Sequence, residues 1–209
     1  MKLFHHTIID WYEDNGRKDL PWRTYSSPYR VLIAEILLRQ TRVSQVAQIY
    51  PKIIERYPNV YSLSLADKRE LKSTISQLGL TSRAEYMVKG ATLIVRKHGG
   101  TVPQKLTELK NLPGVGKYIA HSVICFGFRK SVPLVDSNVS CIYSRIFWGK
   151  EPQNFPLSKD KMWKFAVYML PRKDVQRYNS SLLDLGGLVC NHRKPNCSQC
   201  PLSRWCRYN

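Results

Sequence analysis

Leu112-Pro113-Gly114-Val115-Gly116-Lys117-Tyr118 is the stretch that decides how this chain folds. Apolar residues at helical spacing precede and follow it, so we expect a hairpin joining two helices, the second of which begins at the glycines. Glycine accepts positive φ and lets the backbone approach a ligand closely. A helix N-terminus attracts phosphate through its free N–H groups and its dipole. We therefore predict phosphate contacts by Gly114, Gly116 and Lys117; the alternative is an ordinary helix–helix turn.

The charge of the chain is its most informative global property. The 209 residues include 33 Lys and Arg against 15 Asp and Glu, a formal net charge of +18. This balance favours a polyanionic partner, since mixed charges would serve solubility equally well. The basic residues are scattered, which indicates a folded basic face and no disordered tail. No apolar run is long enough to span a membrane and no signal peptide is recognisable, so we expect a cytoplasmic, nucleoid-associated protein of prokaryotic type that binds no membrane.

Helical periodicity runs through the chain, and no strand alternation of any length interrupts it. Ser27 and Pro28 have the residue types of an N-cap and a first helical position. Leu20-Pro21-Trp22-Arg23 is expected to be extended, because proline disfavours helix in the residue before it. The predicted fold class is all-α, in one large domain or two small ones. The helices expected in the first half of the chain cover residues 8–15, 28–42, 44–57, 67–77 and 82–98.

Two acidic residues, one inside an apolar helical run and one at the start of a later helix, each have two interpretations. Glu35 either faces solvent with Arg39 as its i+4 partner or lines a pocket, and taken alone the sequence favours the solvated face. Asp136 is of the type that caps a helix. It also follows the hairpin closely enough for the two helices to pack and for Asp136 to point toward the same pocket as Tyr118.

Four of the six cysteines lie within the last 20 residues, separated by gaps of six, two and five residues. Four thiols in a chain without a secretion signal indicate a metal site. A zinc ribbon usually has two close pairs, whereas only one C-x-x-C is present, so the spacing favours a cubane iron–sulfur cluster over zinc. Cys125 and Cys141 are expected to pack as small core residues. The four clustered residues are Cys190, Cys197, Cys200 and Cys206.

Together these features resemble the helix-hairpin-helix DNA glycosylases that carry a [4Fe-4S] cluster, the endonuclease III and MutY superfamily. The resemblance covers nearly the whole chain, and the cysteine spacing is its most specific part. It implies a six-helix barrel domain over residues 27–132, and a second domain that combines residues 1–26 and 133–209 and holds the cluster. It also implies an active site in the cleft between them, with Asp136 on one wall and Glu35 and Tyr118 on the other. The segments that carry it are residues 20–23, 28–41, 112–118, 135–138 and 184–186 and the four cysteines.

The residue after the hairpin lysine separates the subfamilies. Bifunctional members have a nucleophilic lysine where this chain has Tyr118, and a phenol cannot form an imine with the sugar. Tyrosine here is similar to the archaeal thymine-DNA glycosylases that act on G:T and G:U mismatches. The resemblance therefore implies a monofunctional base-excision-repair enzyme, which flips thymine or uracil opposite guanine out of double-stranded DNA and hydrolyses its N-glycosidic bond.

Other features keep an adenine glycosylase of the MutY type open, acting on A opposite G or 8-oxoguanine. Asp184-Leu185-Gly186 looks MutY-like, and Glu35 lies where such enzymes keep the acid that protonates adenine. Against this, MutY enzymes tend to have serine in place of Tyr118 and normally continue into a further domain. A non-enzymatic, architectural DNA binder is a third interpretation, and it predicts no need for Asp136.

The resemblance also implies roles for single residues. Asp136 stabilises the oxocarbenium-like sugar or activates water, Glu35 contacts the flipped base or relays a proton, and Tyr118 closes the pocket. Gln40 and Leu80 are expected in two interhelical turns, as wedges that fill the gap left in the duplex. For both, the alternative is an ordinary surface turn residue. We expect a monomer in which the [4Fe-4S] cluster is structural.

Overall fold

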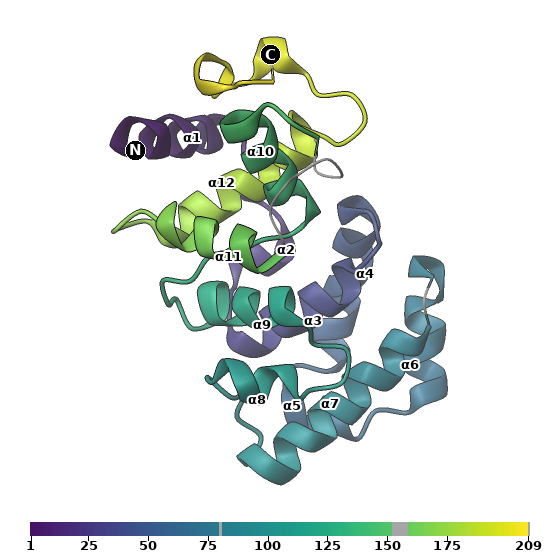
Figure 1. The fold of residues 1–209 in the computed structure, drawn as a ribbon. Coiled ribbons are helices and arrows are strands. Elements are labelled where there is room, and N and C mark those ends of the chain that lie inside the picture. Colours follow the sequence, from purple (N-terminus) through teal and green to yellow (C-terminus); the bar gives the residue numbers. More distant parts are fainter. Residues whose placement is uncertain (80, 152–158, 209) are drawn as a thin grey trace. The chain divides into compact units, whose positions relative to one another are not determined.

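The computed structural model describes residues 1–79, 81–151 and 159–208. Every regular element in this part of the chain is helical, so the all-α prediction is confirmed. None of the helices described is both long and apolar enough to cross a membrane. The chain divides into two compact units (Figure 1). One is Lys18–Lys130, and the other combines Met1–Arg17 with Ser131–Asn209.

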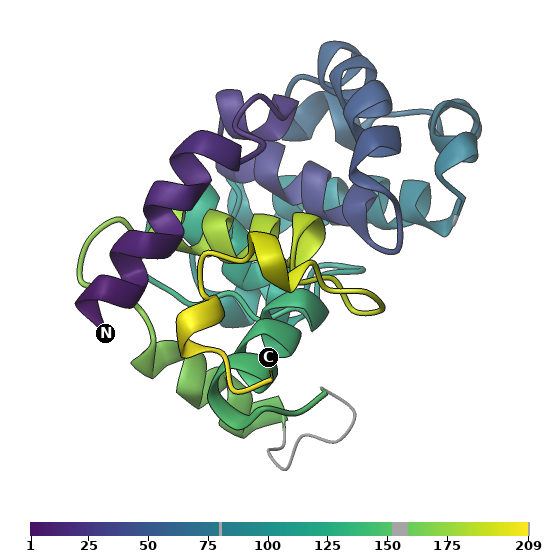
Figure 2. The same ribbon diagram turned by 90° about the horizontal axis from the view of Figure 1, so that it is seen from above.

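The unit Lys18–Lys130 is built around α3. Eight of the eleven residues of α3 are buried, so this helix is apolar on nearly all sides and forms the core of its unit. It contacts α4, α7, α9 and η2 (Figures 1 and 2). The described elements of the unit are α2 (Pro21–Thr24), α3 (Pro28–Leu38), α4 (Val43–Arg56), α5 (Val60–Ser64), α6 (Lys68–Ile75), η1 (Ser76–Leu78), α7 (Ser82–His98), α8 (Leu106–Lys110), α9 (Lys117–Ser122) and η2 (Val123–Gly127).

Local signals account for the helix boundaries that were predicted well. Ser27 caps α3 by accepting a hydrogen bond from the Arg30 backbone N–H at 3.2 Å, and Pro28 occupies the first helical position. The predicted helix 82–98 is confirmed as α7, which ends at Gly99 in the left-handed conformation.

Two local predictions were wrong. Helix α3 ends at Leu38, earlier than predicted, because Arg39 is extended and Gln40 has positive φ. The extended interpretation of residues 20–23 holds only for Leu20; Pro21 begins the single helical turn α2, a position that proline tolerates well.

Residues 18–26 group with α3 and its neighbours, whereas the sequence-based boundary lies after residue 26. Trp22 packs edge-on against Tyr50, with ring centroids 5.6 Å apart. The hydroxyl of Ser26 donates a hydrogen bond to the Phe126 carbonyl at 2.7 Å. These contacts attach the segment to α4 and η2. The six-helix barrel over residues 27–132 stays a prediction.

The second unit is built around α12. Helix α12 packs against both α1 and α10 (Figures 1 and 2). Helix α1 begins six residues earlier than predicted, because Phe4 joins Ile8 and Tyr12 on a buried face at i, i+4 and i+8. Full burial of such side chains stabilises the fold by roughly 1.5–3 kcal/mol each. The described elements are α1 (Lys2–Asn15), α10 (Ser137–Trp148), α11 (Lys159–Tyr168), α12 (Val175–Leu188), η4 (Cys197–Gln199) and η5 (Ser203–Trp205).

Candidate functional site

The glycine hairpin joins α8 to α9, as predicted. Gly114 has φ of +77°, and a Cβ added there would lie 2.9 Å from the ring of Tyr86, so only glycine fits. Gly116 is different: its φ is −88°, and open space surrounds the position of an added Cβ. Gly116 is the N-cap of α9, and Lys117 is exposed directly after it, followed by the half-buried Tyr118. The hairpin therefore leaves the exposed backbone at Gly116 and Lys117 open to close approach.

Three contacts hold this hairpin in place. The side chains of Leu112 and Val115 are buried, and the Val115 backbone N–H donates to the Leu112 carbonyl at 3.1 Å. Arg39, from the end of α3, donates through Nη1 to the Gly114 carbonyl at 3.3 Å. These contacts fix the loop on its buried side, and Gly116 and Lys117 form its exposed tip.

Glu35 is buried, with 9% of its surface exposed, so the solvated-face interpretation is wrong. The Ser122 hydroxyl donates a hydrogen bond to its Oε1 at 2.5 Å. Ser122 was missed by sequence reasoning, although a small hydroxyl inside the apolar run of residues 119–124 is a weak signal for such a partner. A carboxylate inside a helical core is costly unless it is hydrogen-bonded, which is what Ser122 supplies.

Asp136 caps α10, so its N-cap interpretation is confirmed. Its Oδ1 accepts from the Val139 backbone N–H at 2.7 Å, and the Asn138 side-chain amide donates to Oδ2 at 3.3 Å. Burial raises the pKa of Asp136 above its ordinary value of 3.8, while the backbone donors oppose that rise. A carboxylate has two oxygens and several lone pairs, so capping and chemistry are compatible in one residue.

The start of α10 is positioned by the Asp184-Leu185-Gly186 segment of α12. A Cβ added to Gly186 would lie 2.5 Å from the Cβ of Asn138, so the two helices meet where glycine has no side chain. Asp184 is fully buried, and its carboxylate accepts three hydrogen bonds from Arg17. The donors are the Arg17 backbone N–H at 2.8 Å, Nε at 2.9 Å and Nη2 at 2.5 Å. The segment therefore fixes α12 against both Arg17 and the helix that Asp136 caps.

The turn between α3 and α4 carries Gln40 at its tip. Gln40 has φ of +53° and is exposed. The left-handed conformation costs roughly 1–2 kcal/mol for a residue with a side chain, and it persists only where the surroundings impose it. The predicted turn position of Gln40 is confirmed, whereas Leu80 lies outside the described residues.

The four clustered cysteines come together around one cavity. It is lined by all four cysteines, by apolar side chains of α10 and α12 and by Arg145. None of the four forms a disulfide. Four unpaired thiols around one apolar cavity are a suitable donor set for an iron–sulfur cluster. The residues present therefore fit the predicted group.

The thiol of Cys190 has the most polar surroundings of the four. Cys141 hydrogen-bonds to Cys190, and the guanidinium of Arg145, which is only 1% exposed, lies 3.5 Å from its Sγ. These two neighbours lower the pKa of Cys190 below its ordinary value against the opposing effect of burial, whereas burial raises the pKa of Cys200 to about 11. The thiolate is the metal-binding form of cysteine, so this environment favours Cys190 as a ligand.

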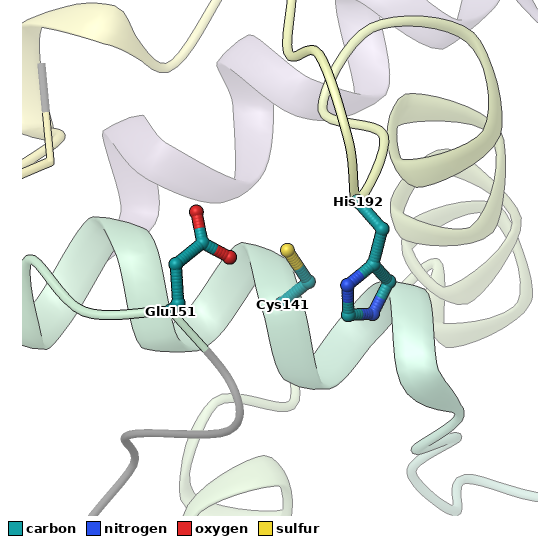
Figure 3. A group of neighbouring side chains, drawn as sticks. All are labelled: Cys141, Glu151 and His192. Carbon is teal, nitrogen blue, oxygen red and sulfur yellow. The ribbon is translucent and has the colours of Figure 1, made fainter.

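A second group of possible metal ligands lies beside this cavity. The side chains of Cys141 in α10, Glu151 just after α10 and His192 in the loop after α12 point toward one another (Figure 3). Their ligand atoms lie within 4.8 Å of one another. Glu151 is already paired with Arg145, Oε1 to Nη2, at 2.9 Å. Two members of the group therefore already have partners, Glu151 in Arg145 and Cys141 in Cys190.

Curated proteins that resemble this chain are DNA glycosylases. Residues 33–165 match the family described as HhH-GPD superfamily base excision DNA repair protein. The chain is 37% identical to the thymine-DNA glycosylase of Aeropyrum pernix, over 100% of this chain and 95% of that protein. It is 38% identical to the thymine/uracil-DNA glycosylase of Pyrobaculum aerophilum, over 96% of this chain and 88% of that protein. An adenine DNA glycosylase of Buchnera aphidicola is 34% identical, over 98% of this chain but 58% of that protein.

Solved structures agree with this relationship. The structure of a thermostable thymine-DNA glycosylase matches with a TM-score of 0.90 at 33% identity, covering 99% of this chain and 95% of that chain. An endonuclease III in a non-covalent complex with DNA matches with a TM-score of 0.82 at 23% identity, covering 99% of this chain and 94% of that chain. At that lower identity the likeness concerns the fold alone.

Proposed function

The chain belongs to the HhH-GPD superfamily of base excision DNA repair proteins and is a DNA glycosylase; from this premise we propose that it removes thymine or uracil opposite guanine in double-stranded DNA. The observation that carries the substrate proposal is the full-length likeness to relatives named for thymine and uracil, at 37% and 38% identity. The adenine DNA glycosylase of Buchnera aphidicola matches at 34%, and this chain spans 58% of its length.

Cleavage of the N-glycosidic bond develops positive charge on the sugar. A fixed carboxylate stabilises such charge best when it is already oriented before the reaction. Asp136 meets this requirement, because the cap to Val139 orients its carboxylate. We assign Asp136 to the stabilisation of the sugar cation or the activation of water, and the buried, hydrogen-bonded Glu35 to the flipped base.

Tyr118 makes the proposed enzyme monofunctional. The hairpin sets which residue follows the lysine at the start of α9, and that residue is a half-buried phenol. A phenol offers no amine for a Schiff base. We therefore expect base release that leaves an intact abasic site, and we expect Tyr118→Lys to add strand cleavage.

The DNA contacts we propose are of two kinds. Gly116 and Lys117, exposed at the hairpin tip together with the fixed Gly114, contact phosphate. Gln40 enters the gap that the flipped nucleotide leaves, and we extend the same role to Leu80. The formal charge of +18 supplies the non-specific attraction to the duplex. We propose that the protein acts as a monomer.

We propose that Cys190, Cys197, Cys200 and Cys206 hold a [4Fe-4S] cluster. When bound, such a cluster supplies a covalent cross-link between the end of α12 and the C-terminal segment, and base removal itself needs no electron transfer. Cys141 and Arg145 support the ligand Cys190 from inside the unit. Zinc is the other metal that four thiols accept, and metal analysis of the purified protein separates the two.

One assay tests the function. Purified protein is incubated with duplexes that contain G:T, G:U, G:A or 8-oxoguanine:A, and strands are resolved with and without alkali. We expect release from G:T and G:U, with strand breaks only after alkali and no borohydride-trapped complex. Release confined to the two adenine duplexes would replace the proposal with the adenine alternative, and efficient borohydride trapping would contradict monofunctional chemistry.

A further inference from the structure

Arg83, in the first turn of α7, is a buried cation that has no carboxylate partner among the described residues. It is 2% exposed. Its Nη1 donates to the Leu37 carbonyl at 2.7 Å, and its Nη2 donates to the Arg39 carbonyl. Within the part of the chain that the structure describes, its buried Nε has no hydrogen-bond partner. The guanidinium thus faces the carbonyl oxygens at the end of α3.

These carbonyls are the groups that a helix leaves unpaired at its C-terminus. The negative end of the helix dipole lies there, so a guanidinium is a favourable cap. With Leu37 and Arg39 bound to Arg83, the Thr41 backbone N–H closes the turn by donating to the Leu38 carbonyl at 3.2 Å. Within this closed turn, Gln40 lies between Arg39 and Thr41 and has a positive φ.

The same turn is connected to the next one. The Thr41 hydroxyl lies 3.2 Å from the Arg39 carbonyl and 3.4 Å from the Leu78 carbonyl, within hydrogen-bond distance of both. Arg83 follows the Leu78-Gly79 turn by a few residues and lies in the first turn of the helix that leads away from it. One buried guanidinium therefore lies where the two turns meet.

Stability alone is a weak reason to keep such a residue. A buried cation with an unpaired N–H stabilises a fold less well than an apolar side chain of similar volume. Unsatisfied buried groups in folded proteins call for another explanation, and function is a common one. Directly after the Arg39 carbonyl that Arg83 binds, the exposed Gln40 has the strained left-handed conformation.

We propose that Arg83 is the positioning residue for Gln40. By binding the carbonyls of Leu37 and Arg39, it fixes the direction in which the Gln40 amide leaves the turn and enters the DNA gap. This inference rests on the proposed function, since Gln40 meets DNA only there. Loss of Arg83 therefore impairs nucleotide flipping while leaving the affinity for matched DNA unchanged.

The test is a double-mutant cycle between Arg83 and Gln40. Arg83→Met, Gln40→Ala and the double variant are compared by single-turnover base release from G:T duplex, and by the fluorescence of 2-aminopurine placed beside the mismatch. We expect each single variant to slow release roughly 10- to 100-fold, as misplacement by about 1 Å does. If Arg83 acts through Gln40, the double variant is no slower than Gln40→Ala alone. Additive losses, or an unchanged flipping signal in Arg83→Met, would overturn the proposal.

Controls separate positioning from folding and from the choice of substrate. Arg83→Lys keeps the charge but loses the two-pronged donor, so we expect partial activity, and it replaces Arg83→Met in the cycle if that variant does not fold. Arg96→Met, an exposed arginine on the same helix, should behave as the unmodified protein. An unmodified protein that releases neither thymine nor uracil refutes the proposed function and this inference with it. A normal unmodified enzyme with an additive cycle refutes this inference alone.

Discussion

Single residues in this chain carry charge in places where folding alone would favour apolar groups. Glu35 is held inside the core of its unit by the Ser122 hydroxyl, and Arg83 is buried against carbonyl oxygens. Asp136 is partly buried at a helix start, with its pKa raised by burial. Perturbed ionisable groups concentrate at functional sites. Asp136 gives the most direct tests, because its cap role and its proposed chemical role respond differently to substitution.

Asp136→Asn should strongly slow base release while leaving the fold and DNA binding in place. Asparagine caps a helix about as well as aspartate, so the free energy of unfolding should change by less than about 1 kcal/mol. Loss of a preorganised group that acts on transition-state charge should slow single-turnover base release by roughly 10²–10³-fold. The matched control is Asp67→Asn, because Asp67 caps α6 through the Arg69 and Glu70 backbone N–H groups. Retained activity in Asp136→Asn would return Asp136 to capping alone.

The pH profile of base release should report the ionisation of the Asp136 carboxylate. The proposed chemistry needs Asp136 ionised, and burial raises its pKa above 3.8. Activity should therefore fall as the pH drops through a value above 3.8, and it should be constant on the alkaline side of that value. Single-turnover rates measured from pH 4 upward check this, with binding followed separately at each pH. A rate that stays constant down to pH 4 would argue against a raised pKa or against the need for the carboxylate.

At the scale of helices, two glycines in helix interiors have opposite surroundings and should respond oppositely to alanine. A Cβ on Gly186 would lie 2.5 Å from the Cβ of Asn138, whereas a Cβ on Gly90 in α7 meets nothing within 4 Å. Gly186→Ala should force α12 from α10 and destabilise the protein by about 1–3 kcal/mol. Gly90→Ala should stabilise it by about 0.5–1 kcal/mol, because alanine is the better helix former. Urea unfolding of both variants measures the difference, and equal effects would mean that the helix contact is not tight.

Substitutions in the glycine hairpin should lower the affinity for DNA without changing the preference for a mismatched duplex. Lys117→Ala should weaken binding to matched and mismatched duplexes alike, and the salt dependence of binding should fall by about one unit, since one phosphate contact is lost. Lys89→Ala is the control of equal charge, because Lys89 is an exposed lysine of α7 outside the hairpin. Titration of both variants over a range of salt concentrations checks this, and a loss confined to the mismatched duplex would contradict it.

The elements that the sequence predicted well are those that depend on local chemistry. Ser27 and Pro28 fix the start of α3, and the hairpin glycines and the apolar spacing around them predict α8, the turn and α9. What could not be predicted depends on distant partners. Ser122 is 87 positions from Glu35, and Arg83 is 44 positions from the Arg39 carbonyl that it binds. No periodicity of either segment encodes such a pair, so the residues alone favoured a solvated Glu35 and gave no signal for Arg83.

At the scale of the whole molecule, the net charge and the cysteine cavity have different proposed roles. The charge attracts DNA, and the cavity holds one unit together. The formal charge of +18 attracts any duplex and does not discriminate among sequences. Discrimination therefore depends on a few fixed residues, and their precision depends on how firmly each unit is held together. In the unit that contains Asp136, the four thiols lie between α10, α12 and the C-terminal segment. A metal there would join three parts of that unit at one point.

Purified protein should therefore be brown and contain about four iron atoms per chain. Cys200→Ser should lose iron, because it removes one of the four proposed thiolate ligands, and the chain after α12 should become sensitive to protease. The control is Cys125→Ser, a buried cysteine in the other unit, which should keep its iron. If the cluster is structural, iron loss in Cys200→Ser should lower the thermal midpoint and base release together, with no change in the pH profile of the remaining activity. A colourless, zinc-containing protein that still releases thymine would refute the cluster and leave the glycosylase assignment intact.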